Sequence, residues 1–213
     1  YRPTAESIVS DARASMTGNY NSIYGYNAAV GITTGQRNVA VGRRTLYSAK
    51  GASYSVAIGM NTLHTSVDDN YNTAVGCQAL YTLNGGVQNQ AYGYSSLYSL
   101  TTGSNNVCIG QESGYSLTTA DGNIMIGYQA GYNETGSNKL YIDSSNTATP
   151  LIYGDFSTNA LTINGALTVT GDIIANGAAI EITGARDEPE GALANLLTAL
   201  ATIGLITDST TAT

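Results

Sequence analysis

The sequence predicts an all-β protein, a repetitive β-solenoid or β-roll with 17-residue coils. The first observation behind this is the composition. Only 11% of the 213 residues are charged, whereas there are 25 glycines and 16 tyrosines. A globular domain ordinarily carries about 25% charged residues. Disordered segments are poor in aromatic and β-branched residues, in which this chain is rich. The composition therefore indicates ordered β structure with a nearly uncharged surface.

The second observation is a glycine that recurs with a constant 17-residue period. Each of these repeat glycines closes a short run, such as NVAVG (38–42), SVAIG (55–59) or NVCIG (106–110). The repeat glycines are Gly25, Gly42, Gly59, Gly76, Gly93, Gly110 and Gly127. A constant period without insertions places each unit equivalently in a stack. We therefore predict an N-terminal connector at 1–17 and a seven-coil solenoid over 18–136.

Alternation along each run assigns side chains to two faces. In the second unit, Val39 and Val41 share one face and Ala40 lies on the other. We expect the valine-type face to form the interior of the coil. The middle residue is small in most units, so we expect another subunit to pack closely outside the coil.

Two further columns mark the corners of the predicted coil. Asn leads the run in six of the seven units, and Asn suits a corner because it tolerates the left-handed backbone. The repeat glycine then supplies a positive φ at the next corner. Tyr occupies the position five residues after the glycine in most units, which predicts a ladder of rings about 4.8 Å apart. His64 takes this position in the third unit, and we expect it to replace one ring.

The segments after the solenoid follow other patterns. Residues 137–160 interrupt the 17-residue period and include Pro150, so we predict a junction there. Residues 161–184 contain LTING and LTVTG, with glycines six residues apart. Such short strands cannot form a core alone, so we predict a short β segment in which three chains intertwine.

Residues 185–213 predict a C-terminal helical clasp. Asp187 can cap a helix, Pro189 suits its first turn, and Gly204 ends the apolar pattern. A short helix is marginal alone, so its apolar face needs partners from the other chains. The predicted clasp residues are Leu193, Leu196, Leu197, Leu200 and Ile203.

Charge and cysteine content exclude several functions. The net charge of −7 belongs to the C-terminal third, and the chain has no basic patch, so we expect no nucleic-acid partner. No stretch of 18 apolar residues occurs, so we expect no membrane insertion. Cys77 and Cys108 fall at different phases of the repeat, which favours two free, buried thiols over a disulfide.

The runs SVAIG and NVAVG resemble the head repeats of trimeric autotransporter adhesins, which form left-handed trimeric β-rolls, although the 17-residue period here is longer than theirs. The segment LTINGALTVTGDIIANG and the closing ALANLLTALATIGLITDSTT resemble phage tail-fibre, tail-spike and head-fibre proteins. These resemblances imply a homotrimeric structural protein on the surface of a virion. It would contact capsid or tail proteins and attach to a host surface. A bacterial adhesin head and a polysaccharide-degrading tail spike are the alternatives.

Catalysis finds little support in the residues, and we expect no enzyme activity, cofactor or metal. A Ser-His-Asp triad needs a histidine base, and His64 is the only histidine. It could bind a metal in a trimer only with Asp68 and Asp69, which we expect in a solvated turn. Glycoside cleavage needs two carboxylates at a set separation. The candidates Glu112, Asp121 and Glu134 fall in turns of different units.

Three tyrosines are candidates for stacking on the sugar rings of a host glycan. Tyr26, Tyr94 and Tyr128 each follow a repeat glycine directly. Tyrosine is equally common at protein interfaces. These rings could therefore shield a subunit contact instead, and the sequence leaves both interpretations open.

Overall fold

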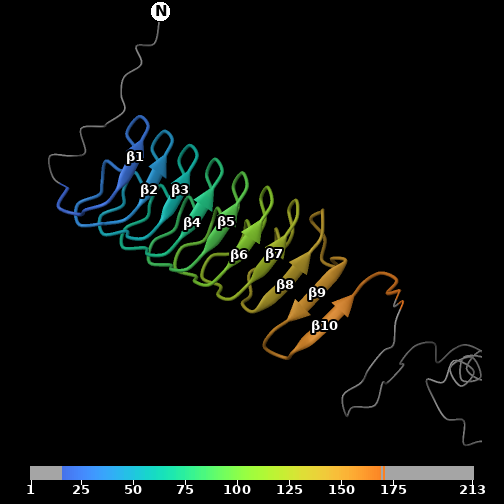
Figure 1. The fold of residues 1–213 in the computed structure, drawn as a ribbon. Helices are drawn as coiled ribbons and strands as arrows, with labels where there is room; N and C mark the ends of the chain where they lie inside the picture. The colour runs from blue at the N-terminus through green and yellow to red at the C-terminus, as the bar shows by residue number, and fades with distance from the viewer. Residues whose placement is uncertain (1–15, 169, 171–213) are drawn as a thin grey trace, which may run out of the picture. The chain divides into compact units, whose positions relative to one another are not determined.

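A computed structural model describes residues 16–168 and 170, which form a single-chain β-solenoid (Figure 1). Ten strands form one sheet in the order of the sequence. The described residues contain no helix, and so none that could cross a membrane. The strands are β1 (Ser22–Tyr24), β2 (Val39–Val41), β3 (Val56–Ile58), β4 (Thr73–Val75), β5 (Gln90–Tyr92), β6 (Val107–Ile109), β7 (Ile124–Ile126), β8 (Lys139–Ile142), β9 (Ile152–Asp155) and β10 (Ala160–Ile163).

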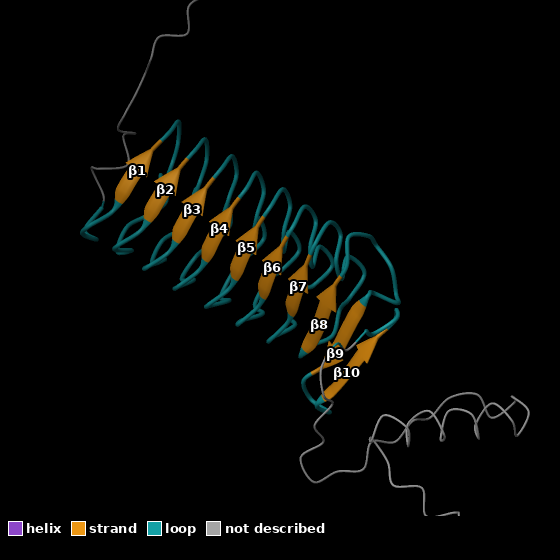
Figure 2. Ribbon diagram, turned by 45° about the vertical axis from the view of Figure 1, so that its right-hand side comes forward, coloured by secondary structure: helices purple, strands orange, loops and turns teal. Residues whose placement is uncertain are grey.

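Each 17-residue unit forms one coil, as the repeat predicts. Strands β1 to β7 pair in parallel, and Ala40 lies opposite Ala57, which in turn lies opposite Ala74. The loops that complete the coils lie one above another in the same order (Figure 2), and backbone hydrogen bonds join them. For example, the Leu46 N–H donates to the Thr62 carbonyl at 3.0 Å. Each coil therefore stacks on the next through both its strand and its loops.

The prediction of which strand face points inward was wrong. The middle residue of each strand from β2 to β7 is buried, and Ala40, Ala57 and Cys108 are fully inaccessible. The flanking residues point outward, and Ile58 and Ile109 are 39% and 42% exposed. Alternation separates two faces but does not say which one is interior. The narrow interior decides, because leucines from the opposite loops already fill it.

The interior is filled by pairs of residues six positions apart. Ala57 pairs with Leu63 in the third coil, and both are fully buried. In the seventh coil the larger residue is Met125, and Gly131 replaces the leucine. A Cβ on Gly131 would lie only 2.3 Å from the Met125 sulfur. Large and small residues thus exchange places while the cross-section of the coil stays constant.

The repeat glycines adopt positive φ, as predicted, and they also permit close stacking. Gly42 has φ 134°, and a Cβ there would lie 2.3 Å from the Gly59 carbonyl oxygen. Any side chain at this position would push adjacent coils apart, so glycine is required for both reasons.

The leading asparagines form a buried ladder that the sequence reasoning missed. Asn89 is fully buried, and its Nδ2 donates to Asn72 Oδ1 at 3.2 Å and to the Gly103 carbonyl at 2.8 Å. Its Oδ1 accepts from the backbone and the side chain of Asn106. The expected left-handed backbone belongs instead to the preceding residue, for example Gln88 with φ 59°.

The sheet continues beyond the seventh coil. Strand β8 pairs in parallel with β7, and Ile124 lies opposite Leu140, so this last step is one residue shorter than the repeat. Strands β9 and β10 then pair antiparallel. Residues 137–160, predicted as a junction, thus carry β8 and β9 and end at the start of β10.

Strand β10 lies at the start of the predicted intertwined segment, and it pairs with β9 of its own chain. Most of that segment lies outside the described residues. So does the predicted clasp with Leu193, Leu196, Leu197, Leu200 and Ile203.

Candidate functional sites

An aromatic ladder runs along the solenoid, as predicted. It joins Tyr47, His64, Tyr81, Tyr98, Tyr115 and Tyr132, with ring centroids 4.9–5.2 Å apart. His64 stacks on the rings before and after it. Burial, and secondarily the Arg44 guanidinium, lower the pKa of His64, which favours the neutral ring. Neighbouring rings cover each inner face, so these rings present their edges and hydroxyls instead of faces on which a sugar could stack.

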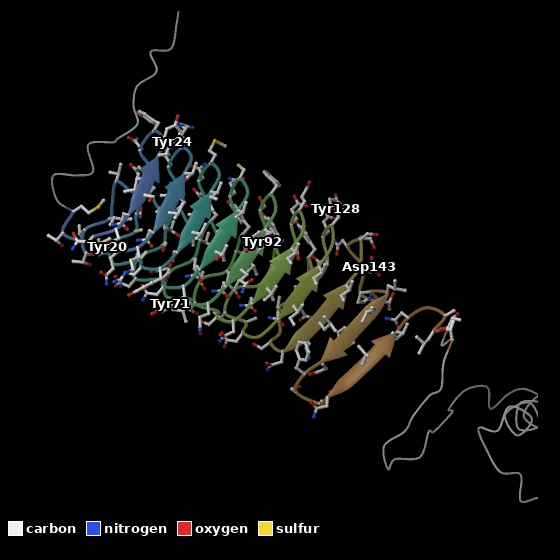
Figure 3. All side chains as sticks on the ribbon, in the orientation of Figure 1. Tyr20, Tyr24, Tyr71, Tyr92, Tyr128 and Asp143 are labelled. Atoms are coloured by element: carbon white, nitrogen blue, oxygen red, sulfur yellow. The ribbon has the colours of Figure 1, made fainter. Side chains whose placement is uncertain are left out.

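The outward side chains of β1 to β7 form a second surface, which we call the strand face. Two columns of side chains run along it from coil to coil (Figure 3). Most of them are apolar and none is charged. Its residues are Ser22, Tyr24, Val39, Val41, Val56, Ile58, Thr73, Val75, Gln90, Tyr92, Val107, Ile109, Ile124 and Ile126. A continuous exposed apolar surface is typical of a protein interface.

The three tyrosines predicted to stack on sugars are exposed but separate. Tyr26, Tyr94 and Tyr128 are 60%, 48% and 48% exposed. Tyr94 and Tyr128 lie two coils apart with Gln111 between them, and Arg43 follows Tyr26 in the same column. None of the three stacks on another ring among the described residues. Their ring faces are thus free of other rings, but the structure does not bring the three together.

The candidate catalytic carboxylates are each held in their own hydrogen bonds. Glu112 accepts from the side chain of Gln129 at 2.6 Å, and Asp121 accepts from the Ser104 N–H at 2.6 Å. Glu134 accepts from the Tyr141 hydroxyl at 2.7 Å. No group of three His, Cys, Asp or Glu within the described residues could hold a metal ion. Each of the three carboxylates thus has a different hydrogen-bond partner.

A small pocket of about 150 Å³ lies beside Glu134 at the C-terminal end of the coils. Asn133, Tyr141 and Asn146 also line it. Burial acts to raise the pKa of Glu134, but hydrogen bonds from Tyr141 and from two backbone N–H groups outweigh it and lower the pKa. Burial and the Glu134 carboxylate raise the pKa of Tyr141. The pair is an ionised acceptor and a neutral donor, which joins the last coil to β8.

The third coil has a polar interior. The prediction that Asp68 and Asp69 are both solvated holds for Asp68 and is wrong for Asp69, which is fully buried. Its carboxylate accepts from the Gly85 N–H, and burial raises its pKa although that hydrogen bond opposes the shift. The sequence contains one indication of this burial, because Asp69 occupies the repeat position that Gly86 holds in the next coil.

Space for the Asp69 side chain comes from a second exchange in the same coil. In the fourth coil, a Cβ on Gly86 would lie 2.6 Å from Cδ1 of Leu83. The equivalent of Leu83 in the third coil is the shorter Ser66, which is 1% exposed. The volume that the serine gives up is thus taken by the carboxylate.

The two thiols are free and lie on different sides of the coil wall. Cys108 is buried in the interior, and burial raises the pKa of its thiol to about 12. Cys77 is only half-buried, because it follows a repeat glycine in the column that also holds Tyr94. The absence of a disulfide was predicted, but the burial of Cys77 is only partial.

Another feature, which the sequence reasoning missed, is an exposed stripe at a corner of the first four coils. It comprises Tyr20, Arg37, Tyr54 and Tyr71, each five residues before a repeat glycine, and we call it the corner stripe. Arg37 lies between two rings, 5.5 Å from the Tyr20 centroid and 5.1 Å from that of Tyr54. Tyr54 stacks on Tyr71 at 5.0 Å. The sequence shows this stripe as large side chains at the same position of four successive repeats.

Comparison with protein-family models, with curated proteins and with solved structures finds no match for this chain.

Proposed function

We propose that this chain is a structural fibre protein of a virion, of the phage tail-fibre or head-fibre type. It would assemble as a homotrimer and present a shaft or tip to the host surface. The observation that carries this proposal is the strand face, which is apolar, uncharged and open along seven coils. An isolated soluble chain rarely leaves such a surface in water.

The exposed fractions along the strand face support burial against another chain. Tyr24 is 58% exposed, and Ile58, Tyr92 and Ile109 are between 37% and 42% exposed. Burial of apolar surface contributes about 25 cal/mol per Å², so covering these columns would stabilise an assembly. The columns repeat with each coil, so a copy of the same chain can match them along their length. Three such faces around one axis would enclose a dry core.

The number three and the place in a virion rest on the resemblance of the repeats and of the C-terminal segments to trimeric fibres. The same runs also suit the head of a bacterial trimeric adhesin, which is the alternative. A polysaccharide-degrading spike is less well supported. Glu112, Asp121 and Glu134 each accept hydrogen bonds from different partners, and no observation on the described residues favours a carboxylate pair for glycoside cleavage.

The test is the mass of the intact chain in solution, measured by light scattering across a range of concentrations. The expected value is three times 22.0 kDa. The double variant Ile58→Lys/Ile109→Lys should dissociate the assembly, because it places charges in the middle of the strand face. The matched control is Thr102→Lys/Thr119→Lys, which adds the same charge at exposed loop positions. It should keep the wild-type mass.

A wild-type chain that stays at 22.0 kDa at all concentrations would refute self-association. Loss of assembly in both double variants would show that charge in general is responsible, and that the strand face is not. Removal of residues 187–213 tests the clasp separately. If the clasp joins the chains, the truncated protein should dissociate at higher concentration than the intact one.

A further inference from the structure

The corner stripe occupies a backbone conformation that its side chains disfavour. Every residue in this column has a positive φ, including Tyr20 at 65°, Arg37 at 57° and Tyr71 at 60°. In later coils the same position holds Gln88, Asn105 and Gly122, and Asn and Gly adopt this conformation most readily. The first coils thus accept a strained backbone to carry large side chains at this corner.

Burial does not account for these side chains. Tyr20 is 78% exposed, Tyr71 is 56% exposed and Tyr54 is 40% exposed, so they add little to the core. Tyr20 and Tyr71 lie along one edge of the solenoid, opposite the edge that carries Tyr128 (Figure 3). Strain without compensating burial is typical of residues retained for recognition.

Arg37 is held in place but keeps most of its donors. Its guanidinium lies between the Tyr20 and Tyr54 rings, and Nη1 donates to the Tyr54 hydroxyl. The only ion pair among the described residues joins Lys139 and Asp155. No described carboxylate therefore pairs with the Arg37 guanidinium. A fixed guanidinium with free donors suits bidentate binding of a carboxylate.

The basic residues of the solenoid are concentrated in its second coil, and one of them, Arg37, belongs to the corner stripe. Residues 18–142 contain five lysines and arginines, and four of them fall within residues 37–50. They are Arg37, Arg43, Arg44 and Lys50. Arg43 belongs to the column of Tyr26 and Tyr128, at the edge opposite the corner stripe, so Arg37 supplies the positive charge of the stripe itself.

We propose that the corner stripe binds a carboxylate-bearing glycan that lies along the solenoid axis. Arg37 binds the carboxylate of one sugar, and the hydroxyls of Tyr54 and Tyr71 bond the hydroxyls of the sugars that follow. The Tyr54 and Tyr71 rings are 5.0 Å apart, close to the length of one pyranose unit in an extended 1,4-linked glycan. An acidic peptide matches less well, because an extended peptide repeats on one side about every 6.8 Å.

This site is separate from Tyr26, Tyr94 and Tyr128, and it does not depend on the trimer or on the place of the chain in a virion. Failure of the glycan test would leave the strand face as an interface. A monomeric chain could equally carry the corner stripe.

Calorimetric titration of the full chain tests the proposal with three probes of matched length. They are an oligogalacturonide with one carboxylate per sugar, an uncharged galactan and a polyglutamate peptide. We expect the oligogalacturonide alone to bind, and to bind more weakly as added salt screens the charge. Arg37→Gln should lower the affinity at least fivefold, and Tyr71→Asn at least threefold. Gln88→Asn, at the next position of the same column, should leave the affinity unchanged.

Thermal unfolding of the same variants separates recognition from structure. Tyr71→Asn should keep or raise the Tm, because Asn suits the positive φ. A fall in the Tm of this variant would mean that the stripe is only a stabilising stack, and would overturn the proposal. Three other results would also overturn it: no binding of oligogalacturonide, equal binding of galactan or polyglutamate, and unchanged affinity in Arg37→Gln.

Discussion

Replacement of Asn89 by Leu tests the buried asparagine ladder most directly, because Leu has the same branched arrangement of side-chain heavy atoms but no polar atoms. In the native protein, Asn89 Nδ2 donates to the Gly103 carbonyl at 2.8 Å, and its Oδ1 accepts from the Asn106 N–H at 3.1 Å. The variant leaves both of these backbone groups without a partner in a site that water does not reach. Asn72 Oδ1 keeps one donor, the backbone N–H of residue 89.

Each buried polar group that loses its partner costs about 1–3 kcal/mol, so the free energy of unfolding should fall by about 2–6 kcal/mol. Urea unfolding followed by circular dichroism at a fixed protein concentration measures this difference. The control is Asn84→Leu, an exposed loop residue whose side chain donates to no described residue. Its effect should stay within about 0.5 kcal/mol. A change below about 1 kcal/mol for Asn89→Leu would refute the view that the ladder carries stability between coils.

Three further predictions concern the interior. Burial raises the pKa of Asp69 in the folded state. The stability that the protonated Asp69 contributes is therefore fully present below the unfolded-state pKa and is lost as the pH rises through the folded-state pKa. Asp69→Asn should remove this loss of stability and raise the Tm at neutral pH, which calorimetry over a pH series would show. Gly131→Ala should lower the free energy of unfolding by about 1–3 kcal/mol, because the added Cβ meets the Met125 sulfur and because Gly131 has φ 60°. In a double-mutant cycle with Met125→Ala, the part of the loss that comes from this contact should disappear, and additive effects would contradict the pairing. Cys77 should react with a thiol reagent in the native protein. Cys108 should react only on unfolding, because burial raises the pKa of its thiol to about 12. Equal reaction rates would contradict the placement of Cys108 inside the coil and of Cys77 at its surface.

The repeat made much of the fold predictable. A fixed 17-residue period allows one unit per coil, and from that follow the parallel pairing of β1 to β7, the positive φ of the repeat glycines and the ring ladder through His64. The inward face was not predictable by the same means. Side chains alternate along a strand wherever the interior lies, and only the volume supplied by residues such as Leu63 shows that the small column points inward.

The candidate sites were less predictable than the fold. Asp69 looked like a loop acid, because its burial depends on space released by Ser66 and not on any local pattern. The corner stripe was visible as a column, but its strain and its held Arg37 emerge only from backbone angles and ring distances. Tyr26, Tyr94 and Tyr128 share a phase of the repeat, yet the residues between them keep them apart.

The exchange of Ala57 and Leu63 for Met125 and Gly131 has a consequence for how such a rod can change in length. Because each coil balances its own interior volume, and the ladders between coils repeat at every step, the coils can act as interchangeable modules. Gain or loss of a whole 17-residue unit would shift the two ends by one strand spacing and leave every ladder aligned. A change of any other length would misalign all of them at once. The length of such a solenoid can therefore change in steps of one coil. The columns of side chains on its outer faces lengthen or shorten by the same step.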